Sequence, residues 1–85
     1  NSSTWKLTPT NDTSNEATNW VENIVPQNPA ILTFKNTVTG TITNDITGLT
    51  VSRILFDIDA PNYTIGGNSI ALQSDLVNNS SQTQV

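Results

Sequence analysis

The pattern of apolar and polar residues changes at Ala30. Before it, in residues 1–29, apolar residues are sparse and follow no period. After it, alternation begins at once, with the apolar residues Ala30, Leu32 and Phe34 on one phase. A period of two is typical of a β-strand that buries one face. The sequence therefore predicts a separate N-terminal segment over residues 1–29 and an all-β region over residues 30–85.

A second alternating stretch follows, and its phase changes part of the way along. Leu49 and Val51 lie on one phase, whereas Ile54, Phe56 and Ile58 lie on the other. Such a slip predicts a β-bulge at Ser52 and Arg53. Together with the later pairs of apolar residues, this pattern predicts a shared interior formed by Leu32, Phe34, Ile54, Phe56, Ile65, Ile70 and Leu72.

Two arrangements of these strands fit the pattern. Gly66 and Gly67 separate two apolar stretches, and paired glycines are typical of a tight hairpin turn, which would give a small antiparallel β-sandwich. Alternatively, the apolar pairs recur every seven to nine residues, which is a suitable spacing for strands separated by corners. That arrangement is a β-solenoid, in which each strand pairs in parallel with its counterpart in the next coil.

The N-terminal segment contains one helical signal. Thr13 and Glu16 have the spacing of a capping box, which predicts a single helical turn from about Ser14 to Asn19. A polar loop with a chance Thr and Glu is the alternative, because the motif is short.

Composition narrows the chemistry. Asn, Thr and Ser make up 34 of the 85 residues, but charged residues are only 12%, which differs from the highly charged composition of disordered chains. The chain has neither His nor Cys, so it lacks imidazole bases, thiol nucleophiles and the usual zinc ligands. We therefore expect no enzyme activity, no catalytic residues, no metal and no cofactor. The net charge of −4 argues against nucleic acid as a partner, and no apolar run is long enough for membrane insertion.

The order of elements resembles a known family. Trp5, the stretch ATNW at 17–20, Pro26, a strand ending in Phe34 and the stretch at 48–72 follow one another as in the autotransporter-associated β-strand repeat, also called the passenger-associated transport repeat. The positions that carry most of the resemblance are Ile54, Phe56, Ala60, Tyr63, Thr64, Ile65, Gly67, Ile70 and Leu72.

The resemblance implies a right-handed parallel β-helix in a secreted or outer-membrane-anchored bacterial passenger protein. Residues 1–29 would be the N-terminal cap and residues 30–85 the first coils, continuing beyond the fragment. The implied function is that of a non-catalytic structural module, which caps and starts a solenoid stalk that supports adhesion or display. Its partners would be the remainder of the parent chain and a surface glycan or host protein.

Four residues are candidates for ligand binding. Asp57 and Asp59 are expected on one outward face and could bind Ca²⁺ or act as a glycosidase pair, but the calcium-loop pattern is missing, so solvated surface charges are the alternative. Trp5 and Trp20 could form a sugar-stacking platform, which would make the chain a carbohydrate-binding β-sandwich. In the solenoid interpretation they instead seal the first coil.

The two ends of a solenoid differ in this sequence. Residues 1–29 should close the N-terminal side, with Trp20 packed over the first apolar layer. The C-terminal side should be open, and an open end presents unpaired backbone groups to other chains. We therefore expect self-association through the C-terminal end.

Overall fold

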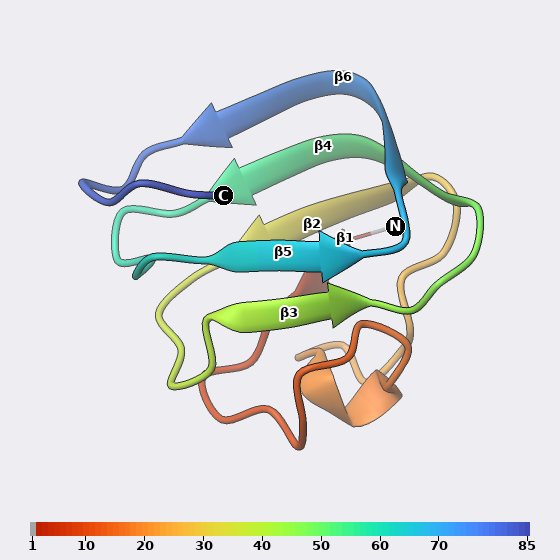
Figure 1. The fold of residues 1–85 in the computed structure, drawn as a ribbon, viewed down its shortest axis with the longest axis horizontal. Coiled ribbons are helices and arrows are strands. Elements are labelled where there is room, and N and C mark those ends of the chain that lie inside the picture. Colours follow the sequence, from red (N-terminus) through yellow and green to blue (C-terminus); the bar gives the residue numbers. More distant parts are fainter. Residues whose placement is uncertain (1) are drawn as a thin grey trace.

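The computed structural model describes residues 2–85, and it is an all-β structure (Figure 1). Its one short helix is a 3₁₀ turn. The strands are β1 (Ser2–Thr4), β2 (Ala30–Phe34), β3 (Thr41–Asn44), β4 (Leu49–Phe56), β5 (Thr64–Gly67) and β6 (Ile70–Asn78), and the 3₁₀ turn is Ala17–Asn19.

The strands form two parallel sheets. One has four strands in the order β1-β2-β4-β6, and the other consists of β3 and β5. From β2 onward, successive strands belong alternately to the two sheets, as Figure 1 shows. Each new strand pairs with the outer edge of the preceding strand in its own sheet. Every strand pair is parallel. The antiparallel sandwich predicted as an alternative is therefore wrong.

Gly66 and Gly67 form no hairpin turn. Both lie within β5, which pairs with β3, whereas the next strand belongs to the other sheet. Gly67 has a φ of 92°, and a Cβ there would clash with the backbone carbonyl of Asn44. Glycine at position 67 is therefore required by both the backbone conformation and the close approach of the neighbouring strand.

Equivalent residues of successive strands lie directly against one another. Leu32 pairs with Ile54, and Ile54 pairs with Leu76. The equivalent positions are thus 22 residues apart along the chain. Side chains with the same position in each strand consequently form rows that cross the strands.

Aromatic rings occupy the centre of the core. Phe34 and Phe56 are stacked with ring centroids 5.3 Å apart, and Tyr63 contacts both rings. The Tyr63 hydroxyl donates a hydrogen bond to the Lys35 carbonyl at 2.6 Å. Burial raises the pKa of Tyr63 above its ordinary value, and the Asp59 carboxylate adds to this effect, so the phenol stays neutral.

Most of the predicted interior is confirmed. Four of its members are buried, namely Leu32, Phe34, Ile54 and Phe56. Ile65 and Ile70 are half-buried and pack against the core. Leu72 is 41% exposed, so its predicted burial is wrong, because it lies on the edge strand β6, beyond which residues 2–85 place no further strand. Ile58 is exposed as well, because β4 ends at Phe56.

The predicted bulge is confirmed and the predicted capping box is not. The pairing of β4 with β6 shifts register between Val51 and Arg53. The helical turn covers only Ala17–Asn19, and no side chain caps it. Thr13 instead donates its hydroxyl proton to the Asn11 side chain at 2.9 Å, which forms a local turn.

Replacing Phe56 by Ala should lower the free energy of unfolding by about 3–5 kcal/mol, because it leaves a cavity between two aromatic neighbours. Urea denaturation followed by circular dichroism measures this change. Ile58→Ala is the matched control, since that side chain is exposed, and it should change stability by less than about 0.5 kcal/mol. Equal stability of the two variants would contradict the assigned core.

Gly67→Ala should destabilise the protein by about 1–3 kcal/mol through its left-handed backbone alone, and the clash with Asn44 should add to that loss. Gly66→Ala provides the control, because its φ is not positive and no atom lies within 4 Å of the added Cβ. Thermal melts of both variants test the prediction. If Gly67→Ala had the same melting temperature as Gly66→Ala, β3 and β5 would approach each other less closely at this position.

Candidate functional site

The chain itself covers the outer edge of the first strand in each sheet, β1 and β3. Along β1, the Val21 amide donates to the Thr4 carbonyl at 2.8 Å, and the Lys6 amide donates to the Asn19 carbonyl at 3.0 Å. Along β3, the Thr43 amide donates to the Asp12 carbonyl at 2.7 Å. Figure 1 shows this covering segment, which follows β1, on the side of the sheets opposite to β6. The first strand of each sheet therefore has backbone partners on its outer edge.

Trp5 and Trp20 are part of the cover and are buried. Each indole is 1% exposed, and the two rings meet edge to face with centroids 5.1 Å apart. Trp20 also contacts Phe34, the first aromatic residue of the core, which confirms that it packs over the first apolar layer. Both indole N–H groups donate to backbone carbonyls, those of Thr39 and Ser14.

This burial bears on the alternative role predicted for the two tryptophans. A sugar stacks on the open face of an aromatic ring, and neither indole presents such a face. The two buried indoles therefore do not form a sugar platform. Carbohydrate binding through these two residues is left without structural support.

A buried asparagine organises the loop next to the tryptophans. The Asn19 side-chain oxygen accepts from the amides of Thr10 and Asn11, at 2.7 and 3.1 Å. Its side-chain nitrogen donates to the Asn11 side chain and to the Thr13 carbonyl. The buried amide is thus satisfied on both its atoms, which gives it a structural role.

A second buried asparagine links three segments of the chain. The Asn44 side-chain oxygen accepts from the Ser14 hydroxyl at 2.7 Å, and its nitrogen donates to the Asn68 carbonyl at 3.0 Å. The Asn68 amide in turn donates to the Asn44 carbonyl. Sequence reasoning missed Asn19 and Asn44. No signal in the sequence marked either residue, because their roles depend on which segments lie side by side in the fold.

Asp57 and Asp59 were expected on one outward face of a strand, but they do not lie in a strand. β4 ends at Phe56, and both acids belong to the turn that follows. The Asp57 carboxylate accepts from the Ile58 amide at 2.8 Å, and its carbonyl accepts from the Ala60 amide. Asp57 therefore has a turn-forming role. Within residues 2–85, no three acidic side chains come close enough together to hold a metal ion.

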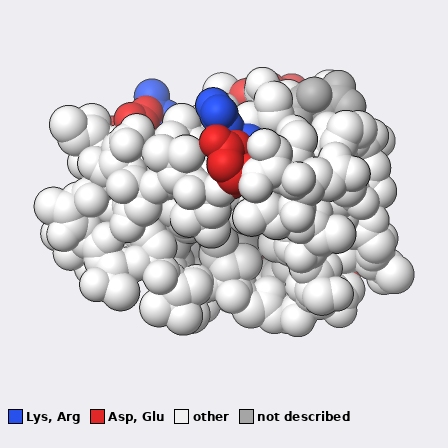
Figure 2. Space-filling view, turned by 90° about the horizontal axis from the view of Figure 1, so that it is seen from above, with Lys and Arg blue, Asp and Glu red and all other residues white. Residues whose placement is uncertain are grey.

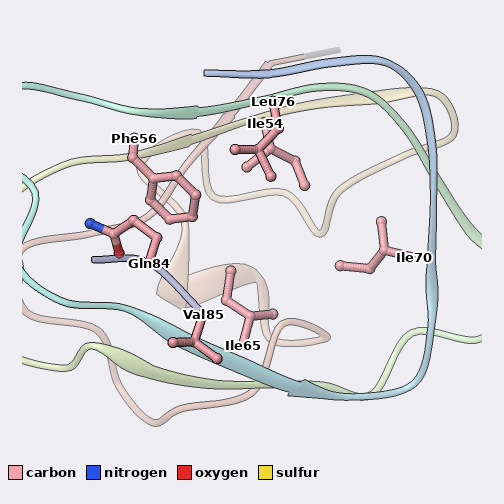
Figure 3. Close-up of a pocket in the computed structure, with 7 residues that line it drawn as sticks. All are labelled: Ile54, Phe56, Ile65, Ile70, Leu76, Gln84 and Val85. Atoms are coloured by element: carbon pink, nitrogen blue, oxygen red, sulfur yellow. The ribbon is translucent and has the colours of Figure 1, made fainter. Parts of the chain in front are cut away.

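The opposite edge of the four-stranded sheet, formed by β6, is not covered in the same way as β1. β6 is its last strand, and within residues 2–85 no strand pairs with its outer edge. An apolar hollow of about 230 Å³ opens beside β6 (Figure 3), and it is lined by Ile54, Phe56, Ile65, Ile70, Leu76, Gln84 and Val85. We call β6 together with this hollow the C-terminal face. Leu76 is 53% exposed there and Val85 is 75% exposed.

The last residues cover part of β5. The Ile65 amide donates to the Val85 carbonyl at 2.9 Å, and the Val85 amide donates to the Tyr63 carbonyl at 3.0 Å. Gln84 accepts from the Tyr63 amide through its side chain. One residue, Val85, thus occupies the place of a further strand beside β5, whereas no strand among residues 2–85 pairs with the outer edge of β6.

Charge is sparse on the C-terminal face. Viewed from the β6 side, the charged side chains lie toward one side and the rest of the face carries none (Figure 2). The acid within β6 is Asp75, and both its oxygens accept hydrogen bonds of 3.0 Å from Arg53 on β4. These bonds lower the pKa of Asp75 below its ordinary value. The pair is exposed, so its main effect is to balance charge.

Comparisons of the chain with protein-family models, with curated proteins and with solved structures gave no match. Among residues 2–85, no helix has the length and apolar character needed to span a membrane.

Trp20→Ala should lower the free energy of unfolding by about 3–5 kcal/mol, because it opens a cavity beneath the cover and beside Phe34. Differential scanning calorimetry measures the loss. The neighbouring Val21→Ala, which trims an exposed side chain, should melt within a few degrees of the parent. If Trp20→Ala melted like Val21→Ala, the cover would not depend on the indole.

Proposed function

We propose that this chain is a non-catalytic structural module, the N-terminal cap and first coils of a right-handed parallel β-helix. The in-register rows support this proposal, because Leu32, Ile54 and Leu76 recur at one interval and lie against one another. The alternation of the chain between two parallel sheets supports it too. Crossovers between parallel strands are right-handed in nearly all proteins, which gives the expected hand.

The observation that carries the proposal is the difference between the two ends. The outer edges of β1 and β3 have backbone partners from residues 12–22, and two buried indoles cover the core. The outer edge of β6 has no such partner among residues 2–85, and an apolar hollow lies beside it. Solenoid proteins need a cap where stacking stops and an uncovered edge where it continues.

The proposed setting is a secreted or cell-surface bacterial protein of the autotransporter-passenger type. In it, residues 1–29 would close the stalk, and residues 30–85 would start the series of coils that carries an adhesive or display region. The remainder of the parent chain would be the main partner, and a surface glycan or a host protein would be bound further along. The absence of His and Cys from the sequence supports a structural role over a catalytic one.

A further coil added after Val85 should stabilise the protein if the C-terminal face accepts solenoid coils. Val85 lies beside the stretch from Tyr63 to Ile65, so a second copy of residues 65–85 attached to it continues the path of the chain. We expect a higher melting temperature and a steeper dependence of unfolding on urea, because more apolar surface becomes buried. Thermal and urea denaturation measure both quantities.

The control is an extension of the same length and composition with its sequence scrambled, which should leave the melting temperature unchanged. A repeated coil that stabilises no more than the scrambled one would contradict a solenoid that grows from this face. Antibodies against the 85-residue chain test the setting, because they should label intact cells of the source organism without permeabilisation.

A further inference from the structure

We propose that two copies of this 85-residue chain join through their C-terminal faces into a closed dimer, in which β6 of one copy pairs antiparallel with β6 of the other. The dimer needs only the uncovered edge of β6 and the apolar hollow beside it. In the proposed longer solenoid the next coil would pair with that same edge, so the dimer is proposed for the 85-residue chain by itself.

The first reason is the backbone of β6. The Asn79 amide, one residue past the strand, donates to the Phe56 carbonyl of β4 at 2.8 Å. Backbone groups along a strand point alternately to its two sides. Leu76 and Asn78 therefore direct their N–H and C=O groups away from β4, where residues 2–85 provide no strand to receive them. A nine-residue edge of this kind is a template for pairing with another chain.

The second reason is the chemistry of the C-terminal face. Proteins commonly protect an exposed edge strand with lysine, proline, inward-pointing charge or a β-bulge. β6 has one bulge, between Leu72 and Asp75, but it contains no lysine or proline, and its single acid, Asp75, is neutralised by Arg53. Leu76 and Val85 line the hollow (Figure 3), and both side chains are exposed. The net charge of −4 would oppose association elsewhere, but this face presents little of it (Figure 2).

The third reason identifies the occupant as a second copy in a closed pair. A head-to-tail contact would need β6 to meet β1 or β3, and residues 12–22 already cover both of those edges. The remaining contact joins two identical faces through a two-fold axis, which closes after two copies. Two-fold symmetry makes the paired strands antiparallel.

Symmetry also fixes the register of the pairing. Ser74 is the middle residue of β6, so a two-fold axis between two paired β6 strands passes beside it. The bulge in the pairing of β6 with β4 lies at the same place, between Leu72 and Asp75, so the ladder between the two copies is formed by the residues on either side of that bulge. Leu72 then lies opposite Leu76 of the other copy, and Asp75 lies opposite Gln73. Apolar residues meet apolar residues across the axis, and the two acids do not face one another.

Sedimentation velocity over a range of concentrations tests the dimer. The parent chain should sediment as a monomer–dimer equilibrium, and Leu76→Lys should abolish the dimer, because it places an unpaired charge in the contact. Val38→Lys makes the same change at an exposed apolar residue remote from β6, whose amide donates to the Leu7 carbonyl near the N-terminus, so it should dimerise like the parent. Circular dichroism confirms that each variant is folded.

Cysteine cross-linking tests the register and does not depend on the folding of Leu76→Lys. The chain has no cysteine, so Ser74→Cys places a single thiol beside the axis. Opposite residues of antiparallel strands have Cα atoms about 4.5–5.5 Å apart, which suits a disulfide. Mild oxidation should give covalent dimers of Ser74→Cys at much higher yield than of Val38→Cys.

The proposal would be overturned by a parent chain that remains monomeric at every concentration or forms open-ended polymers. Equal cross-linking of the two cysteine variants would also overturn it. So would a folded Leu76→Lys protein that dimerises like the parent.

Discussion

The unpaired backbone of an edge strand is the constraint on which this structure depends. A parallel sheet leaves a row of N–H and C=O groups without partners on each outer side, and those groups need water or another chain. At the N-terminal end, residues 12–22 supply the partners. At the C-terminal end, Val85 supplies them to β5 and nothing among residues 2–85 supplies them to β6. Within residues 2–85, the outer edges of β1 and β3 are thus paired and that of β6 is not, and the proposed functions follow from this difference.

Burial follows from the same constraint. A residue in an inner strand has a neighbouring row above and below it, as Ile54 has between Leu32 and Leu76. A residue in the last strand has a neighbour on one side only. This is why Ile54 is buried and Leu76, its equivalent in the next strand, is half-exposed.

Alternation along the sequence was sufficient to predict an all-β region after Ala30 and the bulge at Ser52 and Arg53, because side-chain direction in a strand is a local property. It did not predict β1 (Ser2–Thr4), which is too short to show a period. It could not predict that Leu72 is exposed, because burial depends on which strand lies next to it. The roles of Asn19 and Asn44 were not predicted either. Asn19 is satisfied within its own loop, by groups six to nine residues before it, and no hydrophobic period marks such a residue. Asn44 is satisfied by Ser14 and Asn68, which are 30 and 24 residues away in the sequence, and local reasoning could not bring these together. Composition correctly drew attention to Trp5 and Trp20, and only the packing distinguishes a seal from a sugar platform.

The cover at the N-terminal end has a consequence for how the chain can fold. Trp5 donates its indole proton to Thr39, and Ser14 bonds to Asn44, so the cover is completed by residues 30 or more positions further along. Residues 1–29 therefore cannot close on themselves while the ribosome is still making the first strands. The cover also bonds to Asp45, through the Asn15 amide, so the smallest segment that contains the cover and these partners extends to Asp45. Forming it requires long loops to close before any of these contacts is gained.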